Sequence, residues 1–133
     1  MANPLLIPFE PFHLGKFINR DTGMSDDMST AHIFSNGPAY TAVVDDRIIG
    51  CAGVIILGYG IGVGWMTLSK EVEDHQFWLA KIVKKILRDI IRSFSLRQIE
   101  SFILTDNDKN QLWAAFLGFQ TERQYTRYVR VTR

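Results

Sequence analysis

Three histidines are the side chains of this chain best suited to proton transfer: His13, His32 and His75. Imidazole is the side chain that most readily gains or loses a proton near neutral pH. His32 precedes a group of expected strands, and His75 is expected in the first turn of the longest helix, so either is a candidate general base. An exposed or hydrogen-bonded core histidine is the alternative for each. None has a partner at metal-ligand spacing, so the sequence predicts no metal site.

Two other features suggest chemistry only at first sight. Cys51, the single cysteine, lies in the apolar run IIGCAGVIIL, which favours a small buried side chain over a nucleophile. Glycines alternate in the segment GYGIGVG, whereas dinucleotide-binding loops have the pattern GxGxxG directly before a helix. A glycine-rich hairpin between two strands explains the segment better. One cysteine also excludes an internal disulfide and indicates a reducing compartment.

Composition narrows the class of protein. With 133 residues, of which 47% are hydrophobic and 22% charged, the chain is expected to form one domain, residues 1–133, with its own core. A formal net charge of +1 gives no general attraction to nucleic acid or to a membrane surface. No apolar run reaches the length of a membrane span, and the start MANPLLIPFEPF does not resemble a signal peptide. We therefore expect a cytoplasmic protein with neither a nucleic-acid nor a membrane partner.

The candidate base His75 is positioned by a strand that leads into the longest helix. Apolar residues recur at intervals of three and four from Leu79 to Phe94, with lysines and arginines between them. This spacing predicts an amphipathic helix with a solvated basic face. The acidic segment 69–74, SKEVED, leads into the helix and suits the positive end of its dipole.

The remaining elements are expected to form a sheet around this helix. The segment 11–19 is a short helix with Phe12 and Phe17 turned inward, 30–34 is ambiguous, and Asp45 with Asp46 forms a tight turn. A capping box of Asp108 and Gln111 starts a second short helix, which runs from 109 or 110 to 117 and ends at Gly118. Strands are expected at 5–9 (an edge), 39–44, 47–57, 61–68 and 98–104, with one or two more in 119–131. The fold class is α/β (α+β), with a mixed sheet of about six strands in which 61–68 and 98–104 are parallel.

The tail LTDNDKNQLWAAFLGFQTE resembles the end of the Gcn5-related N-acetyltransferases, the GNAT superfamily. In that family a strand ends in a loop that bears an asparagine, here Asn107, and the next helix ends in a Gly-Phe pair, here Gly118 and Phe119. The order of meander, long helix, strand and short helix is similar as well. The resemblance covers about residues 39–128. It implies a single GNAT-like domain in which the strands 61–68 and 98–104 splay apart.

This resemblance implies transfer of an acetyl group from acetyl-CoA to an amine acceptor. The family's glycine loop for the pyrophosphate is replaced here by 69–74, which has three carboxylates, and its usual tyrosine acid is replaced by Ala114. The implied cofactor-binding residues are the backbone of Trp65, Met66, Thr67 and Leu68, together with Asn107, and the implied catalytic residues are His32 or His75.

Small GNAT-like proteins of short-tailed bacteriophages, such as the internal head-morphogenesis protein of the T7-like group, are similar to this chain and share both departures. The similarity rests on the strand GWMT, the acidic junction without glycine, the basic helix, and the tail QYT. It implies a second function: a catalytically inactive protein that acts in virion assembly or binds a phage or host protein. Such a protein is expected in the host bacterial cytoplasm or in the virion.

Overall fold

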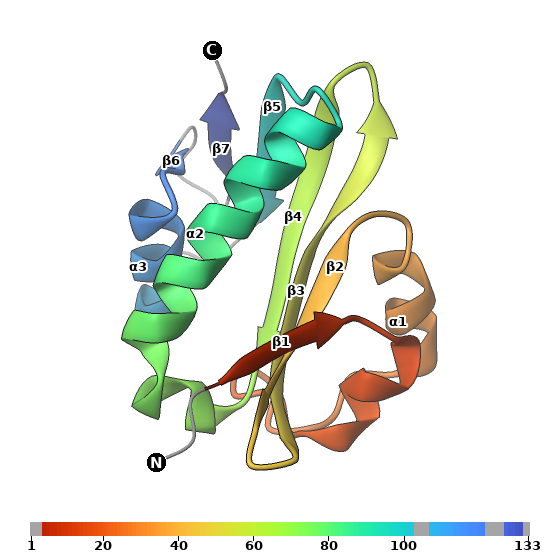
Figure 1. Cartoon of the computed structure of the whole chain (residues 1–133), viewed down its shortest axis with the longest axis vertical. Coiled ribbons are helices and arrows are strands. Elements are labelled where there is room, and N and C mark those ends of the chain that lie inside the picture. Colours follow the sequence, from red (N-terminus) through yellow and green to blue (C-terminus); the bar gives the residue numbers. More distant parts are fainter. Residues whose placement is uncertain (1–3, 103–106, 122–126, 132–133) are drawn as a thin grey trace. The chain divides into compact units, whose positions relative to one another are not determined.

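The computed structural model describes residues 4–102, 107–121 and 127–131 of the chain (Figure 1). The described strands form one mixed sheet in the order β1-β2-β3-β4-β5-β7-β6. By its internal contacts the chain divides into two compact units, Met1–Ile55 with Trp65–Leu79, and Ile56–Gly64 with Ala80–Arg133. Three elements run from one unit into the other: β3 (Arg47–Gly58), β4 (Ile61–Leu68) and α2 (Gln76–Ser93).

The strands of the first unit form an antiparallel meander. β1 (Leu5–Pro8) pairs with β2 (Ala39–Val44), which pairs with β3. β1 is the outer strand of the sheet, as its prolines predict. Asp45 and Asp46 have φ angles of 49° and 64°, which suits the tight two-residue turn predicted between β2 and β3.

Two short helices accompany these strands. The segment predicted as a helix at 11–19 is a 3-10 helix, η1 (Pro11–Lys16), and the ambiguous segment 30–34 belongs to α1 (Met28–Phe34). Phe17 is buried as predicted, whereas Phe12 is 50% exposed, so its predicted inward orientation is wrong. Within η1 the buried residues are His13 and Leu14, so Phe12 lies on the outer side, and Phe17 follows the helix in an extended conformation.

One hydrophobic cluster in the core of the first unit joins the short helices to β3. Leu14, Phe17, Ala31 and Cys51 are its buried members, and partly buried aromatic and aliphatic side chains surround them. Cys51 is 2% exposed, which confirms the prediction that it is a small core residue. Burying such a cluster supplies most of the free energy that holds the short helices in place, because neither is long enough to be stable alone.

The second unit contains the only parallel strand pair of the described residues. β5 (Gln98–Phe102) pairs in parallel with β4, and on its other side it pairs antiparallel with β7 (Arg127–Val131). β7 also pairs with the two-residue strand β6 (Gln120–Thr121), so the sheet has one strand more than the six expected. The part of the predicted strand 98–104 beyond Phe102 lies outside the described residues.

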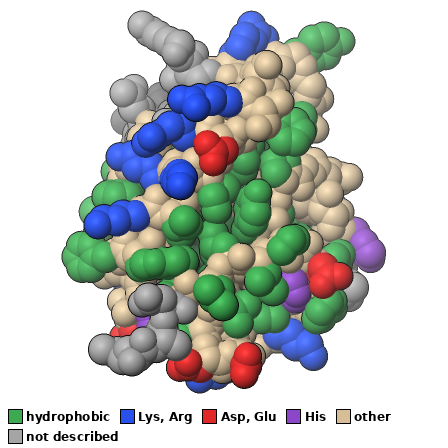
Figure 2. All heavy atoms as spheres, viewed as in Figure 1, with side chains coloured by type: hydrophobic (Ala, Val, Ile, Leu, Met, Phe, Trp, Pro, Cys, Tyr) green, Lys and Arg blue, Asp and Glu red, His purple; other side chains and the backbone are tan. Residues whose placement is uncertain are grey.

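The long helix α2 has the amphipathic pattern that its sequence predicts. Leu79, Leu87 and Ile90 are buried, while Lys81 and Lys85 are exposed. Figure 2 shows a row of lysine and arginine side chains over this helix. No helix in the described part of the chain is both long enough and apolar enough to cross a membrane.

Candidate functional site

The last four residues of β4, 65–68, are the segment predicted to hold the pantetheine arm of acetyl-CoA. At the end of the strand, the Ser69 N–H donates to the Ile49 carbonyl of β3 at 2.8 Å. Backbone groups of a strand point alternately to its two edges, so Met66 and Leu68 present theirs to the opposite edge. There the Leu68 carbonyl accepts a hydrogen bond from the Arg20 N–H at 2.8 Å. Within the first unit, the edge groups of Met66 are therefore the best placed for a ligand.

Side chains fasten the connection between η1 and α1 to this part of β4. The Thr67 hydroxyl donates to the Asp26 carboxylate at 2.5 Å, and the Asn19 amide donates to the same carboxylate at 3.3 Å. Thr67 and Asn19 are both buried. This connection, for most of which the sequence predicted no helix or strand, forms one wall of the site.

Trp65 belongs to the core of the first unit rather than to an open pocket. Its ring stacks on Phe34, with centroids 3.9 Å apart and planes inclined by 5°, and it meets the edge of Phe9 at 5.2 Å. Its indole N–H is buried and has no hydrogen-bond partner among the described residues.

In the second unit, the parallel pairing of β4 with β5 is short. It joins Ile61 to Gln98 and ends with Val63 opposite Glu100. At the next residue the Gly64 carbonyl accepts a hydrogen bond from the Ser101 hydroxyl at 3.2 Å. The Ser101 side chain therefore takes the place of a backbone hydrogen-bond partner where the described pairing of β4 with β5 ends. Residues 65–68 follow this point along β4.

The acidic junction folds differently from its prediction. Lys70–Asp74 is a separate 3-10 helix, η2, held by the buried Val72, and α2 starts only at Gln76. The Glu71 carboxylate accepts two hydrogen bonds from the Arg47 guanidinium, at 2.9 and 3.2 Å. One of the three carboxylates is therefore neutralised by a cation from the start of β3.

The two candidate bases lie apart from any orienting group. His32 is exposed in the last turn of α1, and His75 is half-buried at the end of η2, not in the first turn of α2 as predicted. The His75 carbonyl accepts from the Leu79 N–H at 3.1 Å, which caps the start of α2. Neither imidazole has a hydrogen-bond partner among the described residues, so nothing described fixes a tautomer for proton transfer.

Asn107 caps the helix α3 (Asp108–Phe116) in the second unit. Its side-chain oxygen accepts from the Asn110 N–H at 3.1 Å, so the N-cap is Asn107 and not Asp108 as the capping-box pattern predicted. Gly118, with a φ of 96°, ends the helix as predicted. Ala114, at the position of the family's tyrosine acid, is buried within α3.

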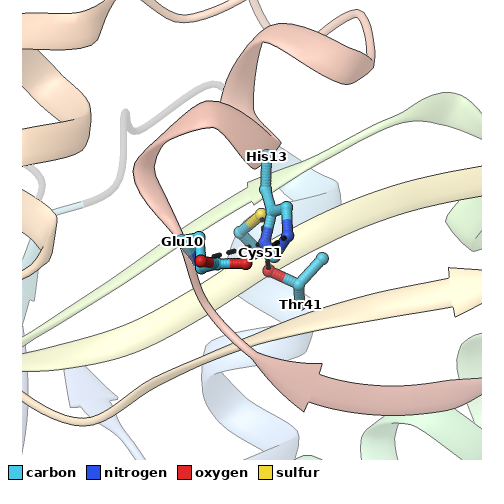
Figure 3. Close-up of polar contacts among 4 residues, drawn as sticks. All are labelled: Glu10, His13, Thr41 and Cys51. Carbon is cyan, nitrogen blue, oxygen red and sulfur yellow. Dashed lines mark hydrogen bonds and ion pairs between the residues drawn. The ribbon is translucent and has the colours of Figure 1, made fainter.

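A buried polar chain in the first unit had no signal in the sequence (Figure 3). The Glu10 N–H donates to His13 Nδ1 at 3.1 Å, so Nδ1 carries no proton, and the Thr41 hydroxyl at 2.7 Å donates to it as well. The Cys51 sulfur lies 3.4 Å from the same hydroxyl. The remaining ring nitrogen of His13, Nε2, lies 3.8 Å from the Glu10 carboxylate.

This buried set of hydrogen bonds stabilises the fold and is poorly suited to catalysis. Burial raises the pKa of the Cys51 thiol to about 12, so the thiol remains protonated at neutral pH and is a poor nucleophile. Burial also lowers the pKa of His13, against a smaller opposing effect of Glu10. The neutral imidazole joins η1 to β2, and its partner on β2, Thr41, lies too far along the chain for spacing to reveal it.

Comparison with known proteins finds similarity in structure and none in sequence. No family model matches the chain, and no curated protein matches it. Among solved structures, a GNAT-family acetyltransferase from Staphylococcus aureus matches with a TM-score of 0.68 and 18% identity over 96% of this chain and 98% of that one. An acetyltransferase from Streptococcus agalactiae gives 0.75 and 12% identity, with 99% and 100% covered. Ard1 from Thermoplasma volcanium gives 0.76 and 9% identity, with 99% of each chain covered.

The chain has the GNAT acetyltransferase fold. The short parallel β4–β5 pair and the order of helices and strands are those that the sequence resemblance to GNAT proteins implied, so that part of the prediction is confirmed. At identities of 18% and below, the GNAT likeness extends to the fold and not to a substrate. The similarity to phage proteins stays a prediction.

Proposed function

We propose that residues 1–133 form a single GNAT-like domain that transfers an acetyl group from acetyl-CoA to an amine. The observation that carries the proposal is the short parallel pairing of β4 with β5, which ends at Val63 and Glu100 in a chain with the GNAT fold. Beyond that point, alternation along β4 turns the backbone N–H and C=O of Met66 to the edge that faces away from β3. An extended ligand with amide groups is complementary to such an edge.

The residues at the end of β4 fit a pantetheine arm in part. Met66 supplies one donor and one acceptor, and the neighbouring Trp65 and Thr67 are held rigidly by ring stacking and by the Asp26 carboxylate. The Leu68 carbonyl can accept a hydrogen bond from the ligand only after its hydrogen bond from the Arg20 N–H breaks. Asn107 remains a proposed contact of the cofactor arm, in addition to its role as the cap of α3.

The end of the cofactor that carries phosphates has a poorer fit. GNAT proteins are expected to cradle it with a glycine loop, and here η2 carries Glu71, Glu73 and Asp74 instead. Arg47 neutralises Glu71 by a hydrogen-bonded ion pair. We therefore expect the pantetheine arm, rather than the nucleotide, to supply most of the affinity.

Acetyl-CoA supplies an activated thioester, and the protein has to position an amine against its carbonyl carbon. The amine nitrogen must lose its proton before it attacks, and His32 or His75 is the proposed base. The Met66 N–H is the proposed donor to the carbonyl oxygen, on which negative charge develops. The leaving sulfur takes up a proton from water, since Ala114 has no acid to offer.

Thermal unfolding with acetyl-CoA and with acetyl-pantetheine tests this proposal. A ligand at a hundred times its dissociation constant raises the free energy of unfolding by about 2.7 kcal/mol. We expect both compounds to stabilise the protein, with affinities within about tenfold of each other because the nucleotide contributes little. No stabilisation by millimolar acetyl-CoA would refute the acetyltransferase proposal.

The acidic junction and Ala114 favour a second candidate function. In this alternative the chain keeps the GNAT fold without catalysis and serves a bacteriophage, in virion assembly or by binding a host protein. Carboxylates where the pyrophosphate would lie and a buried methyl group where an acid is expected are the specific observations. This alternative requires that neither ligand stabilises the protein and that the chain co-purifies stoichiometrically with phage particles; acetyl transfer by the pure protein would contradict it.

A further inference from the structure

A hollow of about 850 Å³ opens in the first unit, beside the end of β4. Its walls come from three places in the sequence: the end of η1 with the segment after it, the turn between β2 and β3, and the start of η2. Its size is that of a site for a small organic molecule. The hollow lies within one unit. It shares Lys70 and Glu71 with the junction that replaces the family's phosphate loop, and it includes none of the β4 residues proposed to hold the pantetheine arm.

Basic side chains outnumber acidic ones around this hollow. Lys16, Arg20, Arg47 and Lys70 line it, against Asp46 and Glu71, so the lining carries four positive and two negative formal charges. The hydrogen bonds between Arg47 and Glu71 balance one charge of each sign. Lys16 and Lys70 are exposed and have no ion-pair partner among the described residues. The surplus positive charge favours an anionic ligand.

A buried hydroxyl in the wall adds a specific polar contact. Ser69 lines the hollow, and its Oγ is buried without a hydrogen-bond partner among the described residues. Its backbone N–H is already bonded to the Ile49 carbonyl, so the hydroxyl is the group left to satisfy. Buried polar atoms without partners are uncommon and costly, and a ligand oxygen would remove that cost.

The rest of the wall is apolar. Ile18 is 55% exposed and lines the hollow beside the partly buried Ile48 and the buried Phe17. An exposed isoleucine that lines a concave surface gains free energy when a ligand covers it. A ligand that matched only the charges would leave this apolar surface in water.

We propose that this hollow is a binding site for a small organic phosphate, separate from the proposed site of the pantetheine arm. The phosphate would lie against Lys16, Lys70 and the Ser69 hydroxyl, and an apolar or aromatic group would lie on Ile18 and Ile48. Phosphate is favoured over carboxylate because several oxygens can accept from two ammonium groups and one hydroxyl at the same time.

Phenyl phosphate is the probe for this site, because it contains both features and neither the pantetheine arm nor the adenosine of coenzyme A. A titration followed by amide NMR shifts should perturb Lys16, Ile18 and Ser69, and inorganic phosphate and phenol should each bind more weakly. Lys16→Ala and Lys70→Ala should each weaken binding by roughly threefold to tenfold, as expected for one charged contact at a partly exposed site. Lys81→Ala, on the exposed face of α2, is the matched control and should leave the affinity unchanged.

Three results would overturn the proposal. If phenyl phosphate does not bind at millimolar concentration, there is no such site. If Lys81→Ala loses as much affinity as Lys16→Ala and Lys70→Ala, the binding is a general attraction between charges. Competition between phenyl phosphate and acetyl-pantetheine would contradict the claim that the sites are separate. The proposal stands if acetyl-CoA fails to bind, because its readout involves neither that ligand nor acetyl transfer.

Discussion

Replacing Thr41 by valine isolates the hydrogen bonds that join η1 to β2. Thr41 is fully buried, and its hydroxyl contacts His13 Nδ1 at 2.7 Å and the Cys51 sulfur at 3.4 Å. Valine has nearly the same shape, so the change removes the hydroxyl without creating a cavity. The imidazole keeps the Glu10 N–H as a donor, so no buried acceptor is left without a partner.

The loss should therefore be that of one good hydrogen bond and one weak one. We expect the free energy of unfolding to fall by about 1–2 kcal/mol, which lowers the melting temperature of a chain of this size by about 3–8 °C. Urea unfolding followed by circular dichroism measures the first quantity and calorimetry the second. Thr41→Ser is the matched control, because it keeps the hydroxyl and loses only a methyl group. A Thr41→Val protein as stable as the parent would refute the role given to this hydroxyl.

The buried hydrogen bonds of His13 also predict how stability depends on pH. Burial lowers the pKa of His13 below its ordinary value of 6.5, so the unfolded chain binds a proton at a higher pH than the folded chain does. The unfolded state then holds more protons, and the free energy of unfolding decreases as pH falls from about 6.5 toward the pKa of the folded state. His13→Gln should flatten this decrease, whereas His32→Gln, at an exposed position, should leave it as steep. An unchanged slope in His13→Gln would contradict the assignment.

Three further predictions concern other parts of the chain. Gly53→Ala should lower the free energy of unfolding by about 1–3 kcal/mol, because a Cβ there would lie 2.6 Å from the Ala39 Cβ and 2.7 Å from the Pro38 carbonyl oxygen; Gly15→Ala, with no atom within 4 Å, should be harmless in the same urea assay. Asn107→Ala should cost about 1 kcal/mol by removing the cap of α3, and Asn107→Asp should keep most of it, as measured by urea unfolding. If the chain transfers acetyl groups, His32→Gln or His75→Gln should lower kcat by about a hundredfold or more and change its pH profile; parental activity in both variants would exclude His32 and His75 as the base.

Local patterns in the sequence were sufficient for most of the elements. Apolar and β-branched residues bounded by turn residues predicted β2 and β4 at their observed limits, and the spacing of Leu79, Leu87 and Ile90 predicted α2. The start of α2 was misplaced because SKEVED carries the acids typical of a first helical turn, and the structure uses them in a separate 3-10 helix. A first turn of α2 and a separate 3-10 helix suit these acidic residues equally well, and the burial of Val72 favours the 3-10 helix.

The candidate site was less accessible to prediction, since its partners are distant in the sequence. Asp26 meets Thr67, and His13 meets Thr41, across long intervals that no local pattern reports. The resemblance to GNAT proteins indicated which end of β4 to consider. It did not indicate that the Leu68 carbonyl accepts a hydrogen bond from the Arg20 N–H. A hydrogen bond between backbone groups depends on the path of a loop and requires no particular side chains.

The division of the chain into two interleaved units has a consequence during synthesis. The first unit needs residues 65–79, which emerge from the ribosome only after the segment 56–64 that belongs to the second unit. Neither unit is a continuous stretch, so an amino-terminal fragment that ends before Leu79 lacks part of the first unit. Vectorial folding of the amino-terminal half is therefore delayed until α2 has begun to emerge, and the strands made earlier must wait without their partners.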